Sequence, residues 1–205
     1  AGAVGVFAQS KASAGEGAVS VALGEGHYIA GGSDGVAVWF SGGRTNSFVN
    51  RGTIVTADGV DGLAVLSDEA TTTIDNYGTL AGDVSLTRGD NRFFNRADAV
   101  FAAGASVDLG GGLLANDGLF ASGGTGRAEF VAVNGRLEQS PTGTTLAEID
   151  FAADASDRVV AYGGMDLAGT LDLSLLNVGD IGIGIFREVI FESAAGITDS
   201  GLALE

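Results

Sequence analysis

Cysteine is absent from this chain, so neither a disulfide framework nor a thiolate metal site can form. Histidine occurs once, as His27 between Gly26 and Tyr28, and any serine–histidine–aspartate triad would have to use it. No Gly-x-Ser-x-Gly nucleophile elbow precedes this histidine. We therefore expect no catalytic residues, no metal ligands and no cofactor, and we predict that the chain is not an enzyme.

Long apolar runs are also missing, because no stretch reaches the roughly 18 residues of a membrane-spanning helix, and no signal peptide is recognisable. Basic residues are scarce, with 10 lysines and arginines against 26 acidic residues and a net charge of −16. A charge of this sign repels phosphate backbones and anionic lipid surfaces. Nucleic acids and membrane surfaces are therefore not expected as partners.

Proline occurs once, as Pro141, whereas glycine occurs 35 times. The glycines bound short apolar stretches at 17–23, 35–40 and 62–66, which have the length of strands and are rich in β-branched and aromatic residues. No segment carries a helical stripe of apolar residues. Because 45% of the residues are hydrophobic, the chain is expected to fold, and it is predicted to be all-β.

One phrase returns along the chain: asparagine, any residue, glycine, threonine and an aliphatic residue. It is complete at 50–54 and 76–80, and looser copies begin at Asn95, Asn116 and Asn134, giving spacings of 26, 19, 21 and 18 residues. An irregular period of about twenty residues is typical of a solenoid whose coils differ in loop length. About ten coils stacked at ~4.8 Å would make a rod of roughly 50 Å.

Asparagines at matching turns of such a rod can form a ladder in which each amide bonds to the amides above and below it. The predicted ladder consists of Asn50, Asn76, Asn95, Asn116 and Asn134. The glycine after each asparagine is expected to permit a left-handed backbone at the corner. If Asn76 is buried in the ladder, its replacement by alanine should cost about 1–2 kcal/mol.

The chain changes character near residue 134. Before it, asparagine and glycine turns repeat, which predicts a rod over residues 1–133. After it, polar and apolar residues alternate cleanly at 146–151, 157–163 and 167–173. This alternation suggests a more ordinary sheet with one solvent-exposed face, which caps the rod over residues 134–205. A sandwich or closed barrel would instead need hairpin turns every 8–12 residues and would not repeat a fixed phrase.

These features together resemble the C-terminal part of the passenger of a bacterial autotransporter of the pertactin-like adhesin type. The asparagine–glycine phrase, the segment Leu86–Asn95 and the tract from Leu137 to Leu171 carry the resemblance. It implies a right-handed parallel β-helix, with residues 137–205 resembling the autochaperone region that helps the passenger fold. The membrane barrel and linker helix of the family are absent, so the family's anchor at the bacterial outer membrane would lie elsewhere in a longer parent protein.

Three further motifs have both a functional and a structural interpretation. The tripeptide Arg88-Gly89-Asp90 is of the kind that integrin receptors bind, but glycine and aspartate also suit an ordinary coil turn. The segment 31–35 resembles one copy of a glycine–aspartate calcium repeat, whereas such sites need successive copies. In the adjacent aromatic pairs at 39–40 and 93–94, alternation predicts one ring inside and one outside.

The resemblance implies a virulence-associated adhesion function at the bacterial cell surface, with a host cell-surface or extracellular-matrix protein or glycan as the partner of a monomeric rod. In a second interpretation, the fragment is a purely structural stalk and folding (autochaperone) segment of a passenger whose active part lies upstream. A third, a β-helical glycan-degrading enzyme, requires clustered acids and bases in a groove.

Overall fold

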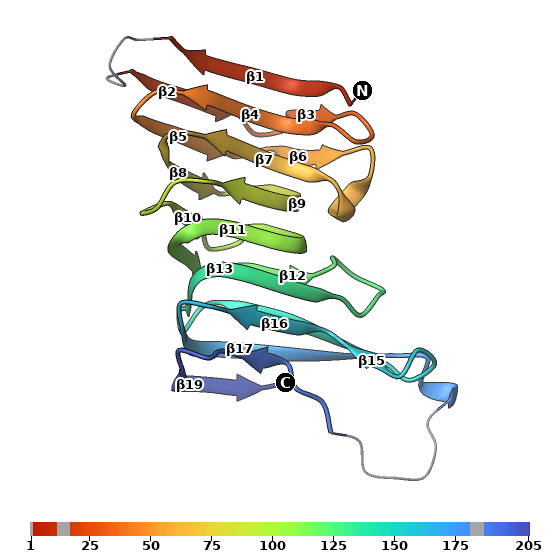
Figure 1. Cartoon of the computed structure of the whole chain (residues 1–205). Helices are drawn as coiled ribbons and strands as arrows, with labels where there is room; N and C mark the ends of the chain where they lie inside the picture. Colours follow the sequence, from red (N-terminus) through yellow and green to blue (C-terminus); the bar gives the residue numbers. More distant parts are fainter. Residues whose placement is uncertain (1, 12–16, 181–186) are drawn as a thin grey trace.

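A computed structural model of the chain describes residues 2–11, 17–180 and 187–205 (Figure 1). The described residues form strands joined by turns and two short 3-10 helices, with no α-helix among them. The all-β class expected from the sequence is confirmed. The strands before residue 96 are β1 (Val4–Ser10), β2 (Ala18–Leu23), β3 (Tyr28–Gly31), β4 (Val36–Gly42), β5 (Thr45–Asn50), β6 (Thr53–Thr56), β7 (Leu63–Asp68), β8 (Thr71–Asn76), β9 (Thr79–Leu86) and β10 (Arg92–Asn95).

Later strands include three long ones that bend around a corner of the molecule. They are β11 (Val100–Asn116), β12 (Leu119–Ser122), β13 (Phe130–Gln139), β14 (Thr144–Asp150), β15 (Ala155–Ser156), β16 (Arg158–Ala161), β17 (Met165–Leu176), β18 (Phe191–Glu192) and β19 (Ile197–Leu204). The 3-10 helices are η2 (Gly59–Asp61) and η3 (Val178–Asp180).

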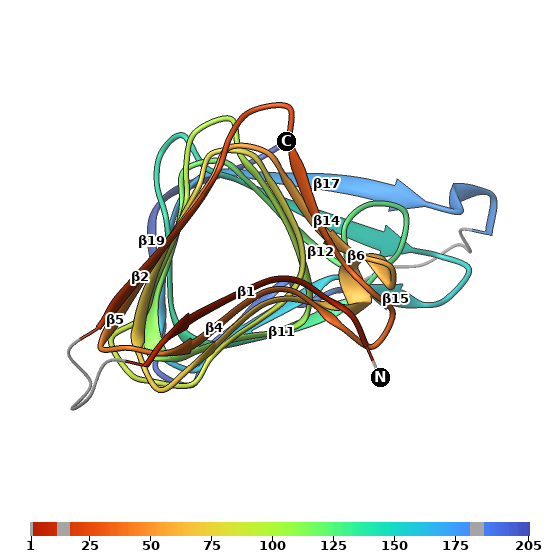
Figure 2. The ribbon, with the colours of Figure 1, turned by 90° about the horizontal axis from the view of Figure 1, so that it is seen from above.

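The strands line three faces around a common axis, and Figure 2 shows the resulting three-sided outline. Face A contains β1, β4, β7, the end of β9, the middle of β11, the start of β13, β16 and β18. Face B contains β2, β5, β8, β10, the end of β11, the end of β13, and the starts of β17 and β19. Face C contains β3, β6, the starts of β9 and β11, β12, β14, and the ends of β17 and β19.

Neighbouring strands on each face are parallel, because each turn of the chain pairs with the turn before it. The one antiparallel pairing among the described strands joins β14 to β15 in a hairpin that projects from the corner between faces C and A. Eight layers lie on each face, so seven steps of ~4.8 Å give a height of roughly 34 Å. The arrangement is all-β, parallel and compatible with a β-helix. It has eight layers where about ten coils were expected, so each layer uses more residues than predicted.

The close spacing of the layers explains why a glycine follows two residues after Asn50 and after Asn76. A side-chain carbon on Gly52 would lie 2.2 Å from the His27 carbonyl oxygen, and one on Gly78 would lie 2.2 Å from the Gly52 carbonyl oxygen. Neither glycine has a positive φ. The expectation of a left-handed corner was therefore wrong for these two: the glycine is needed because the backbone of the preceding layer passes too close for any side chain.

Inward-facing side chains fill the space between the three faces with a continuous apolar core. Phe101 lies between the rings of Phe93 and Phe120, with centroids at 4.5 and 5.5 Å. Phe40 and Phe93 are fully buried, whereas their neighbours Trp39 and Phe94 point outward and are half-buried. This is the in-and-out alternation predicted for both aromatic pairs.

Strand β13 runs through residue 134, where the sequence changes character. Its first half pairs with β16 on face A and its second half with β17 on face B, so the strands after this point continue the same three faces. The alternation seen in the sequence therefore belongs to further layers of the stack. At its two ends the stack presents the exposed strands β1 and β19.

Candidate binding groove

A column of buried side-chain amides marks the corner between faces B and C. The Asn50 Nδ2 group donates to Asn76 Oδ1 at 2.7 Å, Asn76 to Asn95 at 2.9 Å, and Asn95 to Asn116 at 2.8 Å. Each of these amides also donates to a backbone carbonyl of the next layer, at 2.9–3.1 Å. The structure therefore brings four of the five predicted ladder asparagines together, and every amide in the column points the same way.

Asn134 does not belong to this column. It is exposed on face A, where its Nδ2 group donates to Asp108 Oδ1 at 2.7 Å. Gln139 takes the fifth position: its Oε1 accepts from Asn116 at 3.1 Å, and its Nε2 donates to the carbonyls of Ala168 and Thr170. The prediction was wrong because the Asn-Gly pair at 134 falls within β13. The Gly143-Thr144 pair, which repeats the end of the phrase after Gln139, carried the correct signal.

Asn91 is a second buried amide, at the corner between faces A and B, and the sequence reasoning did not single it out. Its Oδ1 accepts from the Thr72 backbone at 2.7 Å. Its Nδ2 donates to the carbonyls of Leu86 at 3.0 Å and Leu109 at 3.1 Å, and also contacts the Arg88 carbonyl. Asn91 thereby fastens the Arg88-Gly89-Asp90 turn to the layers on both sides.

The Arg88-Gly89-Asp90 turn is exposed along its whole length, and Asp90 has a φ of 62°. The next layer passes the turn with a glycine-rich segment: Gly110 is so close to Arg88 that a side-chain carbon on it would lie 2.1 Å from the Arg88 carbonyl oxygen. A side chain on Gly111 would meet no atom within 4 Å. The turn therefore stands beside a notch in which the following layer has no side chains.

This notch opens into a groove of about 730 Å³ on the outside of face B. It is lined by Thr71, Thr73, Asp90, Asn91, Arg92, Gly111, Gly112, Leu113, Arg136 and Glu138. Arg92 pairs in register with Leu113, which pairs with Arg136, so the two guanidinium groups arise two layers, or about 10 Å, apart. The groove thus combines cations, carboxylates and hydroxyl groups along an open surface.

The two arginines of the groove differ in their partners. Arg136 forms ion pairs with Glu138 at 2.9 Å and with Asp166 at 3.8 Å. Arg92 is exposed and has no carboxylate partner within the described chain. Its guanidinium group is therefore available for a planar anion, which it can bind through two parallel hydrogen bonds.

Beside the groove, arginine and aromatic side chains stack along the corner between faces B and C. The Arg51 guanidinium lies 4.8 Å from the centre of the Tyr77 ring, and Arg96 lies 5.9 Å from the same ring and 4.3 Å from that of Phe94. Arg96 also pairs with Asp75. Tyrosine and arginine are enriched at the energetic centres of protein interfaces, so this stack extends the candidate contact surface.

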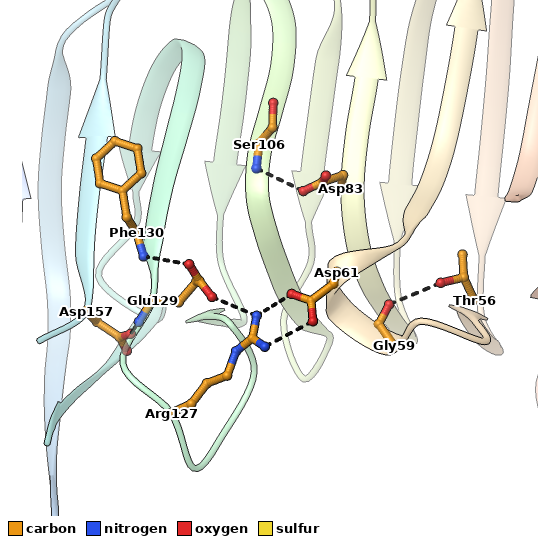
Figure 3. A network of polar contacts seen from close by, with 9 residues as sticks. All are labelled: Thr56, Gly59, Asp61, Asp83, Ser106, Arg127, Glu129, Phe130 and Asp157. Atoms are coloured by element: carbon orange, nitrogen blue, oxygen red, sulfur yellow. Dashed lines mark hydrogen bonds and ion pairs between the residues drawn. The ribbon is translucent and has the colours of Figure 1, made fainter. Parts of the chain in front are cut away.

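Acidic side chains gather at the opposite corner, between faces C and A, and Figure 3 shows their contacts. Arg127 bridges Asp61 and Glu129. The buried Asp157 accepts hydrogen bonds from the backbone of Glu129 at 2.6 Å and of Glu148 at 2.8 Å. Burial, together with the nearby carboxylates of Glu148 and Glu129, raises the pKa of Asp157 to about 7. These contacts hold the loop after β12 against the stack.

Other residues considered in the sequence lie apart from the groove. His27 is exposed, and its Nδ1 lies 2.8 Å from the Glu25 carbonyl oxygen. In the 31–35 segment, Ser33 Oγ and the Asp34 backbone donate to the Asp58 carboxylate at 2.6 and 2.7 Å, which lowers the pKa of Asp58. Within the described ranges, no cluster of histidine, cysteine and carboxylate side chains has metal-binding geometry. Nor does any described helix have the length and apolarity to cross a membrane.

Comparison with protein-family models, with curated proteins and with solved structures finds no match for this chain.

Proposed function

We propose that this chain is a segment of a right-handed parallel β-helix from the passenger of a pertactin-like bacterial autotransporter, and that it attaches the bacterium to host cells or extracellular matrix. Its contact surface would be face B with the groove and the Arg88-Gly89-Asp90 turn. In the full-length parent, an outer-membrane barrel would hold this monomeric rod at the cell surface. The proposal includes no catalytic role.

The parallel register between successive turns supports the solenoid. Pairing proceeds in one direction through every layer, and the amide column requires the same corner to recur at 50, 76, 95, 116 and 139. A connection between parallel strands of one sheet is right-handed in about 98% of cases, which favours a right-handed winding.

The observation that carries the adhesive function is the long, open surface on face B. Outward side chains from successive layers stand in register along it, and the groove of about 730 Å³ lies in its middle. The exposed turn at its edge presents an arginine and an aspartate on a backbone held by Asn91. A partner can therefore lie across several layers without entering an enclosed pocket.

The absence of cysteine allows a direct test, because a single introduced cysteine can carry a bulky polyethylene glycol. Thr73→Cys places the polymer on face B, and Ser85→Cys places it on an equally half-buried outward position of face A. Beads coated with each conjugate are counted on mammalian cells and on immobilised matrix proteins. We expect the polymer at 73 to abolish attachment and the polymer at 85 to leave it unchanged. Equal attachment of both conjugates, or no attachment by the unmodified chain, would refute the proposal.

The second candidate is the structural stalk and folding segment, and the end of the amide column favours it. Gln139 terminates the column by donating to the carbonyls of Ala168 and Thr170. Both residues lie in the tract that resembles the autochaperone region. Truncation after Gln139 removes these acceptors and uncovers the core of the preceding layer. We expect a much lower yield of refolded protein than after removal of residues 1–10 from the other end. Equal yields of the two truncations would exclude a folding role for residues 140–205.

A further inference from the structure

The charge of this acidic chain is divided between two sides of the stack. Nine carboxylates lie at the corner between faces C and A: Asp34, Asp58, Asp61, Asp83, Glu129, Glu148, Asp150, Asp154 and Asp157. Seven of the ten basic residues lie on face B or at its two borders, and nine carboxylates lie in the same region. The cations are Lys11, Arg44, Arg51, Arg88, Arg92, Arg96 and Arg136, and the carboxylates are Glu25, Glu69, Asp75, Asp90, Asp98, Asp117, Glu138, Asp166 and Asp199. The net charge of −16 is therefore spread unevenly: cations are interspersed with carboxylates around the groove and are scarcer at the acidic corner.

The two regions act on a ligand separately. A six-residue strand such as β5 spans about 20 Å, so a full face separates the groove from the acidic corner. Charges further apart than about 8 Å are largely screened at physiological ionic strength. An anion on face B would therefore respond to the arginines and carboxylates of that face and only weakly to the carboxylates of the acidic corner.

Several of these arginines are not neutralised by the protein itself. Arg44, Arg88 and Arg92 are exposed and form no ion pair within the described chain, and Arg51 stacks on Tyr77 without a carboxylate partner. A guanidinium group binds sulfate or carboxylate through paired hydrogen bonds, and it is more weakly hydrated than an ammonium group. The free guanidinium groups around the groove are thus suited to separate planar anions along an extended ligand.

The remaining groove residues restrict the class of polyanion. Thr71 and Thr73 offer hydroxyl groups, and Asp90 and Glu138 offer carboxylates that accept hydrogen bonds from the hydroxyl groups of sugars. The same carboxylates would oppose the unbroken line of phosphates in a nucleic acid. No aromatic side chain lines the groove as a platform for stacked bases.

We infer that the groove on face B binds an acidic glycan, with Arg92 and Arg136 contacting its sulfate or carboxylate groups and Arg88 adding a third cation at the edge. The inference deepens the proposed function, because it rests on face B as the contact surface and names the ligand class. The spacing of Arg92 and Arg136 across Leu113 requires a ligand that carries anions on neighbouring units.

The test measures binding of the full chain to a heparin oligosaccharide by isothermal titration calorimetry at several sodium chloride concentrations. The double variant Arg92→Gln/Arg136→Gln is compared with Arg158→Gln, which removes an exposed arginine from face A. We expect the double variant to bind heparin at least about tenfold more weakly, Arg158→Gln to bind like the parent chain, and binding to weaken as salt rises. Circular dichroism spectra establish that all three proteins are folded.

Additional ligands separate the sources of the anion. Hyaluronan carries carboxylates only. Binding to both hyaluronan and heparin would show that the groove recognises carboxylates as well as sulfates, and binding to heparin alone would show that it recognises sulfates. Equal binding to neutral dextran, to polyglutamate or to single-stranded DNA would overturn the inference, as would an equal loss in Arg158→Gln. Cell attachment that excess heparin does not reduce would overturn it while leaving the proposed function intact. Heparin binding without cell attachment would refute only the proposed function.

Discussion

Asn76 lies in the middle of the amide column, and its replacement by alanine tests whether the column stabilises the fold. The side chain is fully buried and makes four hydrogen bonds. It accepts from Asn50 at 2.7 Å and from the Gly78 backbone at 3.4 Å, and it donates to Asn95 at 2.9 Å and to the Val100 carbonyl at 3.1 Å. Each net hydrogen bond contributes about 1 kcal/mol, and a buried group left without a partner costs about 1–3 kcal/mol. Because Asn95 Oδ1 would lose the hydrogen bond from Asn76, Asn76→Ala should cost about 3–5 kcal/mol.

The matched control is Asn134→Ala, the asparagine that the same sequence phrase placed in the ladder. Its exposed amide makes one hydrogen bond, to Asp108, so the loss should stay within about 0.5 kcal/mol. Urea unfolding followed by far-ultraviolet circular dichroism measures both variants. With a slope of about 2–3 kcal/mol per molar urea, Asn76→Ala should lower the midpoint by roughly 1–2 M and Asn134→Ala should barely move it. Equal midpoints would show that the column contributes nothing to stability.

Three other perturbations probe the core, the layer spacing and the acidic corner. Phe101→Ala removes a fully buried ring from the aromatic stack and should lower the free energy of unfolding in urea by about 3–5 kcal/mol; a loss below 1 kcal/mol would contradict the packing. Gly78→Ala should reduce soluble yield and thermal midpoint sharply because its side-chain carbon would lie 2.2 Å from the Gly52 carbonyl oxygen, and an unchanged midpoint would exclude that close approach. Because burial raises the pKa of Asp157 from 3.8 to about 7, its contribution to stability is complete below pH 3.8 and is lost as pH rises through about 7. Stability should therefore fall between about pH 4 and about pH 7 in the parent chain and less in Asp157→Asn; parallel pH profiles would refute the assignment.

The sequence predicted those parts of the fold that depend on one position repeating in every layer. Asn50, Asn76, Asn95 and Asn116 were found because the same corner recurs and needs the same amide. Gln139 was missed because three residues, where the phrase has one, separate it from its glycine–threonine pair, and because a longer side chain serves the same purpose. The number of layers was overestimated for a related reason, since inserted corner residues lengthen each turn without changing the faces.

The candidate groove could not be predicted in this way, because it joins residues from four layers between Thr71 and Glu138. The basic residues look scattered along the sequence, and their gathering on face B depends on how many residues each corner holds. The Arg88-Gly89-Asp90 turn was noticed as a tripeptide, but its exposure follows from Asn91 and from the glycines of the next layer. Side-chain position at this site is thus set by the stacking and not by any local motif.

The corners of the stack vary in length while the strands between them keep their register. The amide positions are separated by 26, 19, 21 and 23 residues, yet each pairs with the next in the same geometry. Doubling a flexible loop costs only about 0.6 kcal/mol in closure entropy. Foreign peptides grafted into successive corners would consequently be displayed in a row, at intervals fixed by the layer spacing of about 4.8 Å, which makes this architecture a molecular ruler for arranging epitopes.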